Sequence, residues 1–455
     1  MKKIDRESRK ASVVTDDLIA ETIYDPVSKT TQFAVLFAPN EVGFSEEIQV
    51  NGETIYPLDA KNDIVSKGVV LLPSTATDYV SDTELLNGIQ GFIHKYLDIS
   101  PMFERIASYY VLFSWLYDRF YELPYLRAIG DYGSGKTRFL QAIGSLCYRP
   151  IFTGGATTTA PIFRILDEIK GTLILDEADL RFSDMTTDIV KILNMGYQRG
   201  GSVLRMQGKE KLEMKAFDVF SPKIVATRET FSDKALESRF LVEHMGSSSL
   251  RKDIPRRLSD EFYDEARELR NKLLMWRFKN YRKELLFDDA EIEGIHPRLH
   301  QIVIPLLTII EDEEMKISLK DFVKEYNGEL ASDRGQSWEA DVTLAILRLA
   351  QDRGEDSLTV KEISEETNRI IDFSDDHLHA RKVGWIMTKK LHLKTHRTRN
   401  GYTLSLSKNR KTIERWKECF GITDEDIQGN EVNDVNDVHV TKDSDSLKDD
   451  DEILF

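Results

Sequence analysis

Residues 130–137 read Gly-Asp-Tyr-Gly-Ser-Gly-Lys-Thr, and this stretch decides the fold. It matches the pattern G-x-x-x-x-G-K-[ST], in which the backbone N–H groups of a glycine-rich loop surround phosphates. The flanking sequence fits as well, because residues 125–129 form a short apolar run with strand character and residues 137–146 have helical character. A strand, a glycine-rich loop and a helix in this order predict a phosphate-binding site at the N-terminal end of the helix.

The loop supplies side chains as well as backbone groups. Lys136 is expected to reach the β- and γ-phosphates of a nucleoside triphosphate, and the Thr137 hydroxyl is expected to bind Mg²⁺. A nucleoside triphosphate and Mg²⁺ are therefore the predicted ligands of the loop. The residues predicted to bind the nucleotide from the loop are Gly130, Gly133, Ser134, Gly135, Lys136 and Thr137.

A second element lies 40 residues after Lys136. Residues 171–177 form an apolar strand that ends in two carboxylates, and such a strand is typical of the middle of a parallel sheet. Asp176 is expected to hold Mg²⁺ together with Thr137. Glu177 is expected to orient and polarise the water that attacks the γ-phosphate, which would make the site hydrolytic.

Residues 125–245 alternate short apolar runs with helical segments, which predicts an α/β fold with a parallel sheet and crossover helices. Residues 222–227 read as a further central strand of this sheet. Thr227 at its end is expected to sense the γ-phosphate, or to be a simple strand-end hydroxyl. Arg239 follows a short helix and precedes another apolar strand.

The composition narrows the class of protein. The chain has 455 residues, which at about 150 residues per domain allows roughly three domains, and its apolar fraction of 41% is enough to bury a core. The chain has no long apolar run and starts with charged residues, so we expect a cytoplasmic protein without a membrane partner. Two cysteines exclude a disulfide framework. Most of the net charge of −16 lies in residues 424–452, so it does not argue against DNA as a partner.

Four motifs in this order resemble the AAA+ ATPases: GDYGSGKT at 130–137, TLILDE at 172–177, IVAT at 224–227 and ALESRF at 235–240. The resemblance covers residues 125–245, and it implies that the cofactors are ATP and Mg²⁺. It is strongest to superfamily-three and minichromosome-maintenance helicases and to the replication ATPases of plasmids and phages. It implies that Arg239 is an arginine finger acting in a neighbouring subunit's site, and hence a homo-oligomeric ring, expected to be a hexamer. A local ion pair is the alternative role for Arg239.

The segment between the second and third motifs is similar to a hairpin that those helicases insert into the central pore. Residues 202–206 and 212–217 read as its strands. Lys209 and Lys211, near the tip, are expected to touch the DNA backbone, or only to keep the tip soluble.

The helical segment 250–327 is expected to be the lid over the nucleotide. The resemblance to AAA+ proteins also implies a lid arginine that contacts the γ-phosphate, and Arg298, at the start of a helix, is the expected residue. Arg256 and Arg257 compete for this role.

Residues 338–407 read as three helices and a hairpin whose turn is Asn400-Gly401, a dipeptide that favours tight turns. This order predicts a winged helix-turn-helix, which binds either DNA or protein. Residues 381–411 hold ten Lys or Arg and no Asp or Glu. The cations expected to bind DNA are Arg381, Lys382, Lys389, Lys390, Lys394, Arg397 and Arg399.

These segments predict five parts. Residues 1–82 are a β-rich module for docking, oligomerisation or DNA contact. The P-loop AAA+-like ATPase core spans 83–249, the helical lid 250–330, the winged-helix DNA-binding domain 331–420 and an acidic disordered tail 421–455.

The chain is therefore expected to be an ATPase. The first hypothesis is a ring-forming DNA motor or replication initiator, a helicase of a mobile genetic element. The alternative is a DNA-bound AAA+ regulator or loader that switches assembly with ATP without translocating. A remodeller of protein complexes, whose basic charge would be incidental, is the third.

Overall fold

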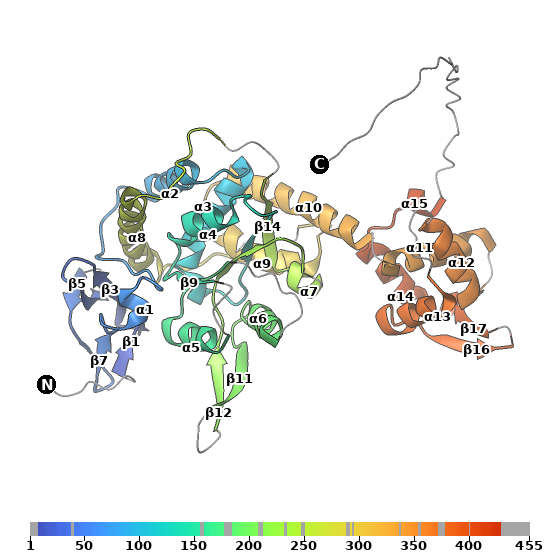
Figure 1. Cartoon of the computed structure of the whole chain (residues 1–455), viewed down its shortest axis with the longest axis horizontal. Helices are drawn as coiled ribbons and strands as arrows, with labels where there is room; N and C mark the ends of the chain where they lie inside the picture. The colour runs from blue at the N-terminus through green and yellow to red at the C-terminus, as the bar shows by residue number, and fades with distance from the viewer. Residues whose placement is uncertain are drawn as a thin grey trace, which may run out of the picture. The chain divides into compact units, whose positions relative to one another are not determined.

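The computed structural model describes residues 8–37, 41–154, 159–176, 184–207, 213–231, 234–246, 251–287, 292–293, 295–335, 338–353, 356–371, 378–399 and 401–428. The chain divides into two compact units, Met1–Lys324 and Glu325–Phe455 (Figure 1). The long helix α10 (Glu313–Gly335) contains this boundary, and it also runs through the expected boundary between residues 330 and 331. No helix among the described residues is both long and apolar enough to span a membrane.

The first unit contains the predicted parallel sheet, and its five strands lie in the order β14-β8-β13-β10-β9. Their bounds, in that order, are Phe240–His244, Tyr125–Ile129, Lys223–Thr227, Leu173–Leu175 and Ile151–Thr153. Every residue of β8, β13 and β10 is buried, which explains their nearly uninterrupted apolar sequences. Because all the pairings are parallel, the carboxyl ends of the strands form one edge of the sheet and the amino ends form the opposite edge.

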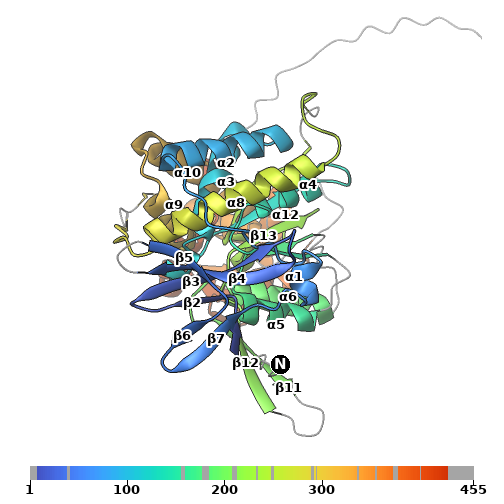
Figure 2. The same ribbon diagram turned by 90° about the vertical axis from the view of Figure 1, so that its left-hand side faces the viewer.

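Helices connect these strands. α4 (Lys136–Gly144) follows β8 and packs on β8, β13 and β10. α5 (Thr159–Ile169), α6 (Asp184–Met195) and the short α7 (Lys234–Glu237) follow β9, β10 and β13 along the chain. The antiparallel hairpin of β11 (Ser202–Gln207) and β12 (Glu213–Asp218) projects from this core (Figures 1 and 2).

Two small sheets precede the core (Figure 2). A four-stranded antiparallel sheet has the order β2 (Ser12–Val14), β3 (Leu18–Asp25), β4 (Thr30–Phe37) and β5 (Glu41–Ser45). A three-stranded sheet has the order β1 (Arg9–Lys10), β7 (Glu53–Pro57) and β6 (Ile48–Val50), and α1 (Asp63–Ser66) follows it in the chain.

The remaining helices of the first unit are α2 (Asp82–Tyr96), α3 (Pro101–Ser114), the 3₁₀ turn Tyr117–Arg119, α8 (Asp260–Asn280), α9 (Pro297–Ile309) and the start of α10. α2 and α3 begin at Ser81 and Ser100, whose hydroxyls accept hydrogen bonds from the backbone N–H groups of Glu84 and Phe103. The aromatic side chains of α3 are buried, so they belong to the core.

The second unit combines helices with a small antiparallel sheet of order β15-β17-β16. Its elements along the chain are α11 (Trp338–Arg353), β15 (Ser357–Thr359), α12 (Val360–Ile370), α13 (Ala380–Trp385), the π-helix Ile386–Lys390, β16 (Thr395–Thr398), β17 (Gly401–Ser405), α14 (Leu406–Cys419) and α15 (Asp424–Gln428). α12 begins with a capping box, in which the Thr359 hydroxyl and the Glu362 carboxylate satisfy each other's backbone N–H groups. The unit has its own apolar core.

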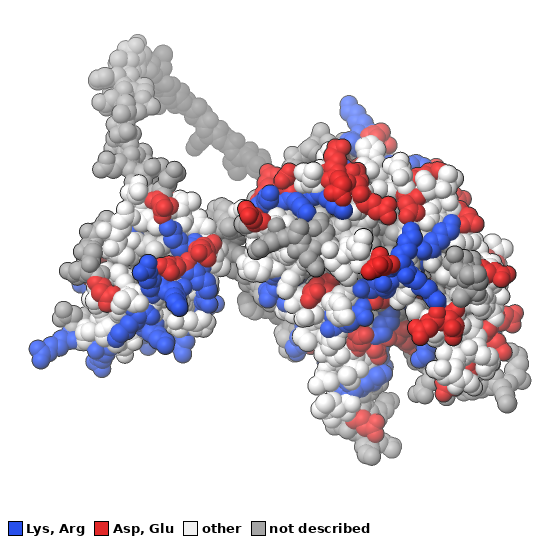
Figure 3. Space-filling view, turned by 180° about the vertical axis from the view of Figure 1, so that it is seen from behind, with Lys and Arg blue, Asp and Glu red and all other residues white. Residues whose placement is uncertain are grey.

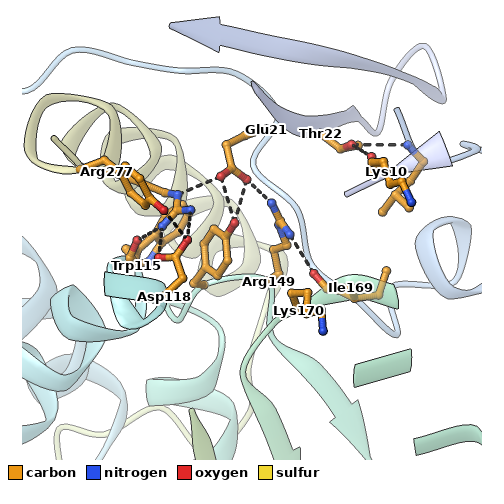
Figure 4. A network of polar contacts seen from close by, with 12 residues as sticks. Lys10, Glu21, Thr22, Trp115, Asp118, Arg149, Ile169, Lys170 and Arg277 are labelled. Carbon is orange, nitrogen blue, oxygen red and sulfur yellow. Dashed lines mark hydrogen bonds and ion pairs between the residues drawn. The ribbon is translucent and has the colours of Figure 1, made fainter. Parts of the chain in front are cut away.

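A buried ionic network ties the N-terminal sheet to the rest of the first unit (Figure 4). Glu21 of β3 is paired with Arg149, which follows α4, and with Arg277 of α8, whose Nε lies 2.8 Å from Oε1 of Glu21. Tyr148 donates its hydroxyl to Glu21 at 2.9 Å, and Arg277 also binds both carboxylate oxygens of Asp118. Burial favours neutral Arg277, but the charges of Asp118 and Glu21 raise the pKa of its guanidinium well above the usual value. One carboxylate thus holds three segments distant in sequence together.

We expect Glu21→Gln to lower the free energy of unfolding by about 3 kcal/mol, because it removes one partner of a buried ionic network. Urea denaturation followed by circular dichroism measures this. The matched control is Glu53→Gln at an exposed position of β7, which should cost less than about 0.5 kcal/mol. Equal stability of the two variants would contradict the role of Glu21.

Candidate active site

The glycine-rich loop curls at the carboxyl end of β8. Gly133 and Gly135 have φ values of +79° and +95°, which favour glycine because it has no Cβ. Gly130 is close-packed instead, since a Cβ there would lie 2.6 Å from Oγ of Ser134 and 2.7 Å from the carbonyl oxygen of Met245. The three glycines are thus required by the shape of the loop itself.

The loop borders a cavity of about 280 Å³ at the carboxyl edge of the sheet. This cavity brings together residues that lie far apart in the sequence. Its lining residues are Tyr132, Gly133, Ser134, Gly135, Lys136, Thr137, Asp176, Ala226, Thr227 and Arg228. Three of the motifs found in the sequence therefore meet at one place.

Thr137 and Asp176 lie in direct contact in this cavity. The Thr137 hydroxyl donates a hydrogen bond of 3.0 Å to Oδ2 of Asp176. The backbone of Asp176 is fixed by β9, because its N–H donates to the Thr153 carbonyl at 3.1 Å. A hydroxyl and a carboxylate are oxygen ligands of the kind that Mg²⁺ prefers, so this pair fits a magnesium ion.

Two buried hydroxyls of the site have no hydrogen-bond partner among the described residues. They are Oγ of Ser134 and Oγ1 of Thr227. Thr227 ends β13, which lies between β8 and β10, and is only 2% exposed. Buried hydroxyls are normally hydrogen-bonded, so two unpaired hydroxyls on residues that line one cavity fit the oxygens of a phosphate.

The Lys136 ammonium stays within the loop. Its Nζ donates to the carbonyl oxygens of Gly130 at 2.6 Å and Asp131 at 2.7 Å. The side chain begins at the first residue of α4, whose positive end faces the loop. A cation and a helix N-terminus at the same place favour a polyanion.

Arg239 lies at the opposite edge of the sheet. Its carbonyl accepts from the N–H of Tyr125, the first residue of β8, whereas the phosphate loop follows the last residue of β8. At about 3.3 Å per residue, the five-residue strand β8 separates the two by roughly 13 Å. The structure therefore does not bring Arg239 to the loop of its own chain.

The Arg239 side chain is 6% exposed and packs locally. Its guanidinium donates to the side-chain carbonyl of Asn194 and lies 4.3 Å from the centroid of the Tyr197 ring. Burial lowers the pKa of Arg239, and the charge of Arg298 lowers it further. Arg298 itself lies 3.5 Å from the Ser238 hydroxyl. The expected lid arginine is thus a neighbour of Arg239 and is not brought to the phosphate loop.

Other predicted residues fall into two groups. Glu177, Lys209 and Lys211 lie outside the described residues. The cations of the C-terminal unit that were predicted to bind DNA are all exposed, on α13, the π-helix and the hairpin region that follows it: Arg381, Lys382, Lys389, Lys390, Lys394, Arg397 and Arg399. Lys382 has its Nζ 3.2 Å from the centroid of the Trp338 ring, so it also packs within its unit.

Sequence reasoning missed two features near the site. Met245 and Gly246 close over the loop, since the Met245 N–H donates to the Ile129 carbonyl at 2.6 Å and Gly246 has a φ of +95°. Arg127 of β8 forms a buried ion pair with Glu237, the residue two before Arg239. The presence of an arginine inside an apolar strand was a sequence signal for the Arg127–Glu237 pair. The sequence has no comparable signal for the closure of the loop by Met245 and Gly246.

No family model and no curated protein matches this chain. Solved structures do. The apo C-terminal region of NrS-1 is 12% identical with a TM-score of 0.36, over 85% of this chain and 95% of that one. The active helicase Cch of SCCmec type IV is 11% identical with a TM-score of 0.35, over 91% and 99%. Cdc6p from Pyrobaculum aerophilum is 12% identical with a TM-score of 0.18, over 76% and 98%.

We expect Thr227→Val to separate stability from catalysis. The hydroxyl it removes has no partner among the described residues, so the free energy of unfolding should change by less than about 0.5 kcal/mol. ATP hydrolysis should fall at least about tenfold, because the phosphate would lose a hydrogen bond.

Thr172→Val is the matched control for this prediction. The Thr172 hydroxyl is buried and donates to the Tyr148 carbonyl at 3.0 Å, away from the cavity. This variant should lose about 1 kcal/mol of stability and keep its turnover. Normal hydrolysis by Thr227→Val would show that Thr227 is only a strand-end hydroxyl.

Proposed function

We propose that the chain is an ATP-hydrolysing DNA motor or replication initiator that acts as a ring, a helicase of a mobile genetic element. The observation that carries this proposal is the hydrogen bond between Thr137 and Asp176 inside the cavity of the phosphate loop. It supplies a metal-binding pair beside a phosphate cradle, which is what nucleoside triphosphate hydrolysis requires.

Each residue of the cradle has a role in hydrolysis. Thr137 and Asp176 would hold Mg²⁺, which neutralises charge on the β- and γ-phosphates when bound. Lys136 would move from the loop carbonyls to the phosphates, and Thr227 would donate to the γ-phosphate. Glu177 follows Asp176 directly in the sequence, so it is the proposed residue that polarises the attacking water.

In this proposal, Arg239 and Arg298 act at the nucleotide of a neighbouring subunit, so that hydrolysis requires two subunits. Both lie at the amino edge of the sheet, away from their own loop, and Arg239 is held there by Asn194 and Tyr197. Their use on a nucleotide therefore requires the loop of another copy. A contact in which one edge meets the opposite edge of the next copy is heterologous, and such contacts form a ring when the rotation between successive copies closes.

The β11–β12 hairpin is the proposed pore element. It is braced along β11, because Arg205 pairs with Asp188 of α6 and lies 4.5 Å from the centroid of the Phe163 ring in α5. Lys209 and Lys211 belong to the segment that joins its two strands. A braced hairpin with cations near its tip suits contact with the phosphates of DNA.

The C-terminal unit is the proposed winged helix. Helices α11, α12 and α13 with β15, followed by the β16–β17 hairpin, give the order of elements that this module needs. The exposed cations of the π-helix and β16 support a nucleic-acid partner over a protein partner. In the proposed domain plan, this unit follows the N-terminal β-rich module, the ATPase core and the helical lid.

We expect the wild-type protein to hydrolyse Mg-ATP faster with DNA than without it and to separate the strands of a forked duplex. Glu177→Gln should keep ATP binding and lower hydrolysis by about 10²-fold or more, since it removes the carboxylate that polarises water. Phosphate release and strand displacement measure these effects. Asp179→Asn is the control, and it should behave as wild type. Hydrolysis without strand displacement would favour the DNA-bound regulator.

Mixed assemblies test the role of Arg239. Arg239→Ala should reduce hydrolysis by about 10³-fold, and Lys136→Ala should abolish nucleotide binding. A mixture should regain activity at up to about a quarter of its interfaces, where an intact Lys136 meets an intact Arg239 of the next copy. Arg164→Ala, at an exposed position of α5, is the control. A mixture as inactive as its components would contradict action between subunits.

A further inference from the structure

The C-terminal unit has a cationic surface in which two large aromatic side chains are exposed. We call it the basic face and define it by Arg381, Lys382, Lys389, Lys390, Lys394, Arg397, Arg399, Trp385 and Tyr402. All seven cations are exposed, and the sequence has no Asp or Glu between residues 378 and 413. Figure 3 shows Lys and Arg gathered on this unit around the projecting hairpin. The charge of this face fits a polyanion.

Trp385 is one of the two aromatic residues. It is 52% exposed, although the two residues after it, Ile386 and Met387, are buried in the core of the unit. The Leu391 N–H donates to the Ile386 carbonyl at 2.9 Å, five residues back, which makes a π-helix of Ile386–Lys390. Short π-helices are rare and are often found at functional sites.

The π-helix places a cation beside the indole. Nζ of Lys390, five residues after Trp385, lies 5.8 Å from the centroid of its ring. An anchored helix thus presents a half-exposed aromatic plane together with a positive charge, the combination on which nucleotides stack.

Tyr402 is the second aromatic residue and is 58% exposed on β17. It pairs with Arg397 of β16, so the two side chains share one face of the hairpin. Leu404, two residues on, shares that face and is fully buried in the core with Ile386 and Met387. Tyr402 and Arg397 therefore lie on the side of the sheet that packs against the helices, where they extend past the core.

We propose that the basic face binds unpaired nucleotides, with the bases stacked on Trp385 and Tyr402 and the phosphates bound by the surrounding cations. The ligand class is single-stranded DNA, alone or beside a duplex. This inference rests on the proposed DNA-binding function and names the substrate of that surface.

The aromatic rings decide between single and double strands. Cations bind the phosphates of either form, and this part of the affinity is independent of sequence. A base in a duplex is already stacked and paired, so a side chain reaches its plane only after the base has left the stack. An unpaired base stacks on an exposed ring directly, whatever its identity. Two rings among cations therefore add affinity for the unpaired form alone.

The test compares the full-length protein with Trp385→Ala/Tyr402→Ala, without nucleotide. Fluorescence anisotropy with a labelled oligothymidine strand and a labelled duplex of equal length gives both affinities over a range of salt. We expect the double variant to lose at least about tenfold in single-strand affinity, because two stacking contacts are removed. Duplex affinity should change less than about twofold, and both salt slopes should stay the same because no cation is lost.

Two further variants separate stacking from charge and from folding. Trp385→Phe/Tyr402→Phe keeps two aromatic planes and should keep the preference for the single strand. Lys389→Gln/Lys390→Gln should weaken binding to both DNAs and reduce both salt slopes. Thermal unfolding confirms that all variants are folded.

The outcomes of these binding measurements separate the stacking inference from the proposed DNA-binding function. A selective loss of single-strand affinity in the alanine variant, restored by phenylalanine, supports the inference. Equal losses on both DNAs, or no loss, overturn it and leave DNA binding by this unit standing. A wild-type protein that binds neither DNA overturns the proposed DNA function as well.

Discussion

One hydrogen bond, from the Thr137 hydroxyl to Asp176, joins the phosphate loop to a strand two places away in the sheet. It exists because β8, β13 and β10 are parallel and in register, so their carboxyl ends meet at one edge. A shift of β10 by one residue would turn the Asp176 side chain to the other face of the sheet. The metal-binding pair, the phosphate cradle and the Thr227 hydroxyl between them all depend on this register.

The same parallel arrangement separates the arginines from the site. β8 begins at Tyr125, which is hydrogen-bonded to Arg239, and the phosphate loop follows its last residue. The length of this strand therefore separates Arg239 from the phosphate loop of its own chain. Burial and the neighbouring charge of Arg298 both lower the pKa of Arg239, which means that the pair of cations would gain from an anion. In the proposed ring, the triphosphate of the next copy provides it.

Much of the site was predictable because its motifs are local. The glycine loop needs a strand before it and a helix after it, and an apolar strand that ends in Asp176 needs a position inside the sheet. The predicted parallel sheet was confirmed. The position of Arg298 was not predictable, because it depends on how α9 packs. The partners of Glu21 and Arg127 come from distant segments, and periodicity within a segment does not reveal them.

The most direct measurement is a cryo-electron microscopy structure of the full chain with Mg²⁺ and a slowly hydrolysed ATP analogue. It should show the γ-phosphate between Lys136 and Thr227 of one copy, Mg²⁺ on Thr137 and Asp176, and Arg239 of the next copy at that phosphate. A monomer that closes around the analogue with its own Arg239, or an analogue bound away from the glycine loop, would contradict the proposed mechanism.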